Sequence, residues 1–188
     1  MNENYDRLLA AYENLEAGRY DAARAEFEAL GALGEHQALL YLGSMYERGL
    51  GVEIDQAAAA AFYGTSCAAG NTKSCFFLGL LKFRNGDFEG ALGPYRIAAD
   101  AGHPAAAYWI AQIYGDIKNP RFDKNQKIHY LKIASKRGHV FATRDLAKIN
   151  ILESKSLFSK LVAFSSYLKS ILKGFFIILR DADDPRVQ

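Results

Sequence analysis

The sequence contains little cysteine and little proline. Of its 188 residues only Cys67 and Cys75 are cysteine, which is too few for a disulfide-rich scaffold. Only four residues are proline, and the chain lacks the extended runs of Val, Ile and Thr that are typical of strands. Half of the residues are hydrophobic, and alanine is abundant in the first two thirds. We therefore expect an all-α protein with a buried core.

Short motifs that mark common catalytic sites are also missing. The sequence has no HExxH, GxSxG, GxxxxGK or CxxC. Its four histidines, His36, His103, His129 and His139, are scattered, and three of them stand just after glycines where helix starts are expected. We therefore predict a protein that is not an enzyme and that binds no metal or other cofactor.

The N-terminal residues, MNENYDRLLAAYENLEAGRY, show no apolar stretch and no small-residue cleavage site. This pattern predicts no secretory signal and a cytoplasmic location. Because that compartment is reducing, we expect Cys67 and Cys75 to be reduced thiols that pack as small hydrophobic side chains.

Charge is distributed unevenly, although the formal net charge is only +2. Residues 1–35 carry eight acids and three bases, whereas residues 117–148 carry nine bases and two acids. We interpret the basic segment as a solvated helix surface. Because it also contains Phe122, Tyr130 and Phe141, nucleic-acid binding stays open as a lesser alternative.

A repeated helix ending is the strongest signal in the chain. An apolar segment that ends in glycine recurs at Gly34, Gly70, Gly102 and Gly138, with spacings of 36, 32 and 36 residues. A bulky residue stands seven positions before each glycine, and a new helical pattern follows it. In the second unit the small Gly43 is expected to let the two helices of a pair approach closely.

The second unit resembles a Sel-one-like repeat, a relative of the tetratricopeptide repeat. The resemblance is carried by Leu42, Gly43, Tyr46, Gly49, Gly51, Val52, Asp55, Ala58, Tyr63 and Gly70. In that family a GxGV turn joins the two helices, and an aspartate beyond it starts the second, which is consistent with Asp55 as an N-cap. Units 1–34 and 71–102 have shorter turns of tetratricopeptide type, and unit 103–138 has GDIKNPRFDKNQK in place of GxGV.

This resemblance implies a right-handed αα-hairpin solenoid over residues 1–153. We place its units at 1–34, 35–70, 71–102 and 103–138, with a half unit at 139–153. Helix pairs are expected at 2–15 with 19–33, 36–48 with 55–69, 72–85 with 88–101, and 104–115 with 124–137. An amphipathic helix at 154–180 and a polar tail at 181–188 follow.

Transfer of the helix positions from the family points a set of side chains to the concave side of the solenoid. Several are aromatic or basic, a mixture that is typical of interface hot spots. They are Arg48, Lys73, Phe76, Leu80, Phe83, Arg84, Tyr108 and Gln112. We therefore predict a protein-interaction scaffold or adaptor that binds a peptide or domain there. A register slip of one residue would place the aromatics in the core instead.

The cysteine spacing resembles that of cysteine-rich Sel-one-like repeat proteins, in which such pairs form disulfides. The resemblance thus implies an optional disulfide between Cys67 and Cys75. The absence of a secretory signal favours the reduced state that we expect above.

Residues 156–179, SLFSKLVAFSSYLKSILKGFFIIL, form a strongly amphipathic pattern. Ser166 and Ser170 are expected on its solvent side, and lysines make a spanning helix unfavourable. Three roles stay open: a cap over the last repeat, an occupant of the concave groove, and an interfacial helix of a peripheral membrane adaptor. The residues expected to make the capping or membrane contact are Leu168, Leu172, Phe175, Phe176 and Leu179.

Overall fold

The computed structural model describes residues 3–117, 119–154, 156–180 and 184–186. The chain forms two compact units, residues 1–94 and 95–188. The helices that lie wholly in the first unit are α1 (Glu3–Glu16), α2 (Tyr20–Ala32), α3 (His36–Arg48), α4 (Gln56–Ala68) and α5 (Thr72–Arg84). Helix α6 (Phe88–Asp100) begins in the first unit and ends in the second. The predicted boundary between a repeat region and a C-terminal helix at residue 153 stays a prediction.

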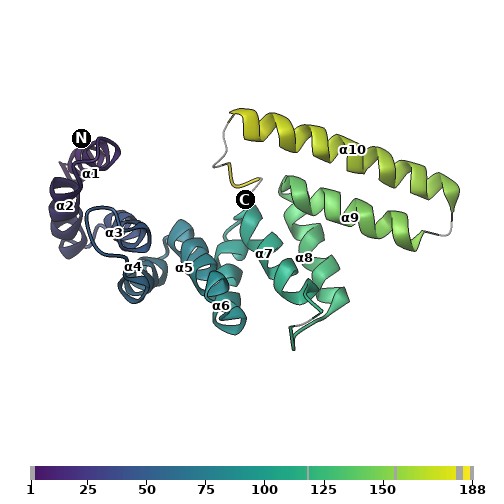
Figure 1. Cartoon of the computed structure of the whole chain (residues 1–188), viewed down its shortest axis with the longest axis horizontal. Helices are drawn as coiled ribbons and strands as arrows, with labels where there is room; N and C mark the ends of the chain where they lie inside the picture. The colour runs from purple at the N-terminus through teal and green to yellow at the C-terminus, as the bar shows by residue number, and fades with distance from the viewer. Residues whose placement is uncertain (1–2, 118, 155, 181–183, 187–188) are drawn as a thin grey trace. The chain divides into compact units, whose positions relative to one another are not determined.

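In the second unit, α6 is followed by α7 (Pro104–Gly115), α8 (Lys124–Lys136), α9 (Val140–Glu153) and α10 (Leu157–Arg180). The described residues contain no strand, which confirms the predicted all-α class (Figure 1). The pairs α1–α2, α3–α4 and α7–α8 pack together as expected from the repeat. Their ends lie within one or two residues of the predicted positions.

The residue after each repeat-ending glycine has two roles. All four glycines, Gly34, Gly70, Gly102 and Gly138, have positive φ angles of 85–99°. The next residue closes the preceding helix, as in the hydrogen bond from Asn71 N to Ser66 O (3.0 Å). Its side chain then caps the following helix, since Asn71 Oδ1 accepts from Ser74 N (3.1 Å). One residue therefore sets both the end of one hairpin and the start of the next.

Side-chain packing within the first unit forms two clusters. One joins α1, α2 and α3 around Phe27, Leu30 and Met45. The other joins α3, α4 and α5 around Leu40, Tyr63 and Leu81. Each helix thus buries one side against its pair and another against the next pair, which is the packing that a helical repeat needs for stability.

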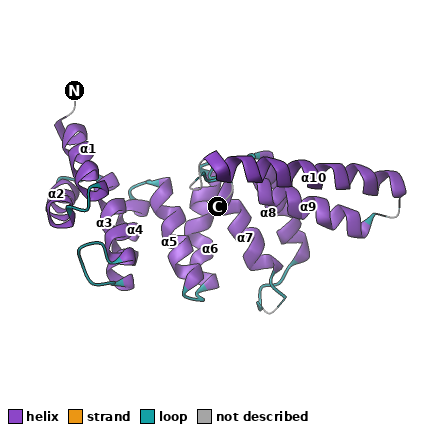
Figure 2. Ribbon diagram, turned by 45° about the horizontal axis from the view of Figure 1, so that its top comes forward, coloured by secondary structure: helices purple, strands orange, loops and turns teal. Residues whose placement is uncertain are grey.

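The predicted Gly-rich turn joins α3 to α4 in an extended loop (Figure 2). Gly49 and Gly51 have φ angles of 71° and 69°, in the left-handed region that favours glycine. A Cβ on Gly51 would lie 2.3 Å from Cβ of Tyr20, so the turn also needs glycine for close approach to α2. Asp55 is the N-cap of α4, and its Oδ1 accepts from Ala57 N and Ala58 N, both at 2.9 Å.

The fourth unit closes its loop in the same way despite its different sequence. Asp123 N donates to Tyr114 O (2.9 Å), as Asp55 N donates to Tyr46 O (3.0 Å) in the second unit. Asp123 Oδ1 accepts from Asn125 N (2.8 Å) and caps α8. A tyrosine and an aspartate nine residues apart therefore define both long turns.

Cys67 and Cys75 form a disulfide in the structure, with their Cα atoms 4.6 Å apart across the turn from α4 to α5. This is the pairing that the family resemblance implies. Our expectation of two reduced thiols is corrected by this finding, because the tight turn at Gly70 places the end of α4 against the start of α5.

Helix α10 packs on the shorter α9, and the views of Figures 1 and 2 agree on this. The side facing α9 carries the buried residues Ala163, Ser170 and Gly174. A Cβ on Gly174 would lie 3.2 Å from Cγ1 of Val140. Ser170 was expected on the solvent side of the helix, and that prediction is wrong: small residues allow close approach to α9, so the small face is buried.

The end of the described chain returns to the start of α9. Val140 N donates to Arg186 O (2.8 Å), which satisfies one of the amide groups that a helix N-terminus leaves open. The Arg186 guanidinium pairs with Asp184, and this pairing lowers the pKa of the Asp184 carboxyl to about 2. The described part of the predicted polar tail thus contacts the last helix pair.

Candidate functional site

The predicted partner-binding residues of the first unit lie on α3 and α5. Arg48, Lys73 and Arg84 are exposed, and Leu80 and Phe83 are half-buried. Phe83 packs edge-on against Phe88 of α6, with ring centroids 5.2 Å apart. These residues offer cationic groups beside apolar surface.

Phe76 does not belong to this surface, since its side chain is only 2% exposed. Its ring packs edge-on against Phe77 (5.6 Å between centroids). The equivalent residue one repeat earlier, Leu40, is also buried, in the cluster that joins α3 to α4 and α5. This helix position faces neighbouring helices in both repeats, so the assignment of Phe76 to an open concave surface is corrected.

A carboxylate that links three helices borders the surface. Glu47 Oε1 of α3 accepts from Arg84 of α5 (2.9 Å), and its Oε2 accepts from the Tyr63 hydroxyl of α4 (2.8 Å). Burial, reinforced by the negative charge of Glu47, raises the pKa of Tyr63 well above its usual range. Sequence reasoning did not find this network, because it joins residues 37 positions apart.

The remaining predicted partner-binding residues, Tyr108 and Gln112, are half-buried on α7 in the second unit. The Tyr108 ring stacks on buried His139, with centroids 4.3 Å apart, and its hydroxyl donates a long hydrogen bond to Asp145 Oδ2 (3.4 Å). Burial, followed by the charge of Asp145, raises the pKa of Tyr108 to about 12. His139 in turn caps α9, because its Nδ1 accepts from Ala142 N (3.2 Å).

Aromatic residues of the basic segment are largely engaged within the fold. Tyr130 stacks on Tyr114 (6.0 Å between centroids), and Phe141 lies under the Arg144 guanidinium (4.9 Å). Only Phe122 of the three aromatics that suggested nucleic-acid stacking is largely exposed. This arrangement offers little of the stacking platform that single-stranded nucleic acid requires.

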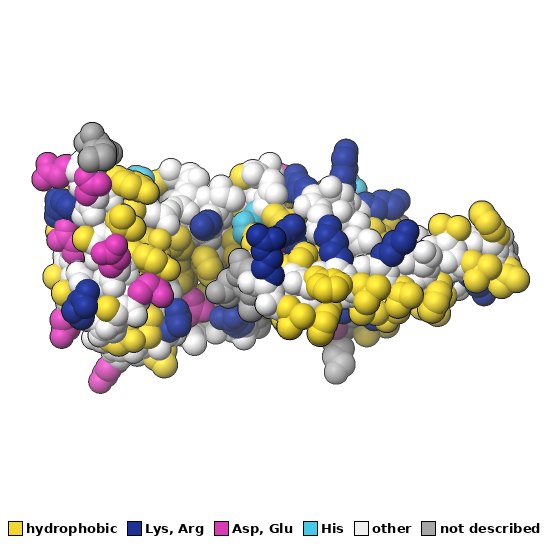
Figure 3. Space-filling model, turned by 90° about the horizontal axis from the view of Figure 1, so that it is seen from above, with side chains coloured by type: hydrophobic (Ala, Val, Ile, Leu, Met, Phe, Trp, Pro, Cys, Tyr) yellow, Lys and Arg dark blue, Asp and Glu magenta, His cyan; other side chains and the backbone are white. Residues whose placement is uncertain are grey.

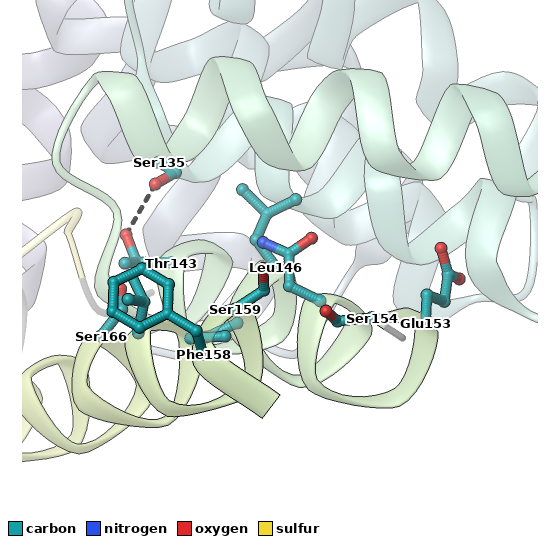
Figure 4. Close-up of a pocket in the computed structure, with 12 residues that line it drawn as sticks. Ser135, Thr143, Leu146, Glu153, Ser154, Phe158, Ser159 and Ser166 are labelled. Atoms are coloured by element: carbon teal, nitrogen blue, oxygen red, sulfur yellow. Dashed lines mark hydrogen bonds between the residues drawn. The ribbon is translucent and has the colours of Figure 1, made fainter. Parts of the chain in front are cut away.

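A groove of about 710 Å³ lies between α8, α9 and α10 (Figure 4). Five hydroxyl side chains line it: Ser135, Thr143, Ser154, Ser159 and Ser166. Ser135 and Thr143 share a hydrogen bond (2.8 Å between hydroxyl oxygens), which Figure 4 marks. The lining includes Glu153, whose carboxylate pairs with Lys124 (2.6 Å), and the described residues that line the groove include no His, Cys or Lys. The lining can therefore donate and accept hydrogen bonds.

Elsewhere, too, the described residues provide little for metal or cofactor chemistry. No three His, Cys, Asp or Glu side chains come together there in a group that could hold a metal ion.

The residues predicted to make the capping or membrane contact lie on the side of α10 that faces away from α9. Leu168, Leu172, Phe175, Phe176 and Leu179 are 48–68% exposed. Figure 3 shows a row of apolar side chains along this helix, with Lys and Arg side chains beside it. By length and composition, α10 is also the one described helix that is long and apolar enough to cross a membrane. Helix α10 packs on α9 through its small residues, and its apolar face points away from α9.

Comparisons with solved structures identify the fold. A protective antigen present in uropathogenic Escherichia coli strains, which displays an SLR fold, matches 92% of the chain with a TM-score of 0.75 and 22% identity. The chain spans 39% of that antigen's length. A Sel1 repeat protein from Oxalobacter formigenes matches 90% of the chain, and 69% of its own, with a TM-score of 0.73 and 23% identity.

Sequence comparison gives a shorter match. An uncharacterized protein of Neisseria meningitidis serogroup B is 43% identical over 56 residues, which is 30% of this chain and 12% of that protein. No family model matches the chain. The structural matches, at 22% and 23% identity, establish the fold, which is an αα-hairpin solenoid of SLR type. They confirm the expected resemblance to Sel-one-like repeats as a likeness of fold.

Proposed function

Because the chain has the SLR fold, we propose that it is a non-enzymatic protein-interaction scaffold that binds a peptide or domain of another protein. The observation that carries the proposal is a helical-repeat fold whose described residues present side-chain surfaces on α3, α5 and α7. Repeats of this kind bind through extended surfaces of their stacked helices.

The chemistry of these surfaces favours a partner with acidic and apolar groups. In the first unit, exposed Arg48 and Lys73 accompany half-buried Leu80 and Phe83. In the second unit, half-buried Tyr108 provides an aromatic ring, whereas Nε2 of the Gln112 amide is buried. Arginine and aromatic side chains are enriched at interface hot spots, and cations steer acidic partners into contact.

The experiment is affinity capture with the full chain, followed by mass spectrometry. The double variant Arg48→Glu with Lys73→Glu should lose the partners that the wild-type chain captures, because both side chains are exposed and the changes leave the core intact. Lys132→Glu on α8 is the control, since it reverses another exposed cation. Equal capture by all three proteins would contradict the proposed surface.

A second candidate function is peripheral association with a membrane, at its cytoplasmic side, through α10. It is favoured by one observation, the exposure of the apolar face of this helix while its small residues hold it on α9. The two functions are compatible, because the membrane contact and the partner surface use different helices.

A further inference from the structure

Helix α10 carries two separate faces along its length. Its inner face contains the buried residues Ala163, Ser170 and Gly174. Its outer face, on the opposite side at 100° per residue, contains Leu161, Leu168, Leu172, Phe175 and Leu179, all of them largely exposed. An apolar strip that runs the length of the helix is much larger than scattered exposed side chains require, so it indicates a contact surface.

The charges on the helix indicate what covers this strip. All of its charged residues are basic, and Lys160, Lys169, Lys173 and Arg180 are exposed. At 100° per residue they lie between the outer and inner faces, where long side chains can extend beside the apolar strip. A second copy of the helix would bring cations toward cations with no acid on either helix to pair with them. An anionic lipid surface provides both a negative charge and an apolar layer.

Packing on α9 determines the orientation of the helix. The buried inner residues Ala163 and Gly174 are eleven positions apart, so α10 follows α9 over about 16 Å. Lys148 of α9 also lies over the Tyr167 ring, 5.8 Å from its centroid. A helix held along its side in this way presents its outer face parallel to a surface. To cross a bilayer it would have to leave α9 and bury Lys169 and Lys173 in hydrocarbon.

We propose that α10 is an interfacial helix that lies in the plane of an anionic lipid leaflet while it stays packed on α9. This inference rests on the second candidate function and specifies its lipid chemistry and geometry. Leu168, Leu172 and Phe175 enter the boundary between headgroups and acyl chains, and Lys169 and Lys173 contact the anionic headgroups. The acidic residues that follow Arg180 in the sequence end the cationic stretch.

Vesicle flotation with the full chain tests the proposal. The wild-type chain should float with vesicles made from an equal mixture of phosphatidylglycerol and phosphatidylcholine, and much less with pure phosphatidylcholine. Lys169→Gln with Lys173→Gln should weaken binding to the anionic vesicles about 30-fold, since each cation near such a surface contributes a factor of about five. Leu168→Gln with Phe175→Gln should abolish flotation.

Leu33→Gln with Ile54→Gln is the matched control, because both residues are exposed apolar side chains outside α10. This variant should float like the wild type, and circular dichroism should show that all variants keep their helices. Three results would overturn the proposal: no flotation of the wild type, equal binding to neutral vesicles, or a dimer that Leu168→Gln with Phe175→Gln dissociates. Resistance to extraction by alkaline carbonate would also overturn it, because it indicates a spanning helix. The charge reversals on α3 and α5 test the scaffold function separately.

Discussion

Gly43 of α3 lies directly against the ring of Tyr63 on α4: a Cβ atom on Gly43 would be 2.5 Å from Cδ1 and Cε1 of that ring. The Tyr63 hydroxyl is held by Glu47, so the ring cannot move away without loss of that hydrogen bond. The close approach of the two helices therefore depends on a residue without a side chain.

We predict that Gly43→Ala lowers the free energy of unfolding by about 1–3 kcal/mol, because the overlap outweighs the gain in helix propensity of about 1 kcal/mol. Gly64→Ala in α4 is the control, since a Cβ there meets no atom within 4 Å. It should stabilise the protein by up to about 1 kcal/mol. Urea unfolding followed by circular dichroism measures both, and an equal effect of the two changes would refute the argument.

Phe76→Ala should lower the free energy of unfolding by about 3–5 kcal/mol, because truncation of a buried aromatic side chain leaves a cavity. Lys73→Ala on the same helix should change it by less than about 0.5 kcal/mol, since Lys73 is exposed. A Phe76→Ala protein as stable as the wild type would show that this ring belongs to an open surface after all.

Asp123→Ala should destabilise the protein by about 1 kcal/mol, because the N-cap of α8 loses the oxygen that accepts from two backbone amides. Asp123→Asn keeps an oxygen at the same place and should cost much less. Thermal unfolding of the two variants beside the wild type makes the comparison. If both variants melt at the same temperature, the side-chain cap is not what stabilises this turn.

The disulfide should contribute about 2–3 kcal/mol, since it closes a loop between residues only eight positions apart. A reducing agent should therefore lower the melting temperature of the wild-type chain but leave that of Cys67→Ala with Cys75→Ala unchanged. Mass spectrometry after alkylation of freshly lysed cells reports the state in the cell. Complete alkylation without prior reduction would restore the expectation of reduced thiols.

Alkaline pH should weaken the fold partly through Tyr108. Its pKa rises from an ordinary value of 10.0 to about 12 in the folded state, so the folded protein holds this proton more tightly than the unfolded chain. The stabilisation is complete below pH 10 and is lost as the pH rises from 10 through 12. Tyr108→Phe should lose less stability than the wild type over this range in urea unfolding. Parallel curves for the two proteins would show that Tyr108 is not involved.

The helix boundaries followed from the sequence because they depend on local chemistry. A glycine with positive φ ends each hairpin, and the residue after it caps the next helix, so the spacing of Gly34, Gly70, Gly102 and Gly138 located most of the elements. The closure of the fourth turn was equally readable, since Asp123 follows Tyr114 at the same distance as Asp55 follows Tyr46. The fourth turn lacks the glycines of the second, and its closure depends on the spacing of tyrosine and aspartate instead.

Residues whose role depends on a neighbouring helix were harder to predict. Periodicity showed which side chains of α10 share a face, but not that Ala163, Ser170 and Gly174 would meet α9. Likewise, the burial of Phe76 depends on the helices that pack against it, so the sequence of its own helix does not reveal it. The Glu47–Arg84 pair joins two repeats, and nothing in either segment alone specifies it.

The two long turns close in the same way although their sequences differ. In both, the closing hydrogen bond joins backbone atoms, and the cap requires only an aspartate at its end. The residues between the tyrosine and the aspartate therefore differ between the two units, GLGVEI in one and a proline-containing segment in the other, while each loop keeps its own contacts, such as that of Gly51 with Tyr20. Such loops should be exchangeable between repeats, so transfer of residues 47–54 into the fourth unit should yield a folded chain. A repeat of this kind can therefore acquire a loop of different chemistry without changes in its core packing.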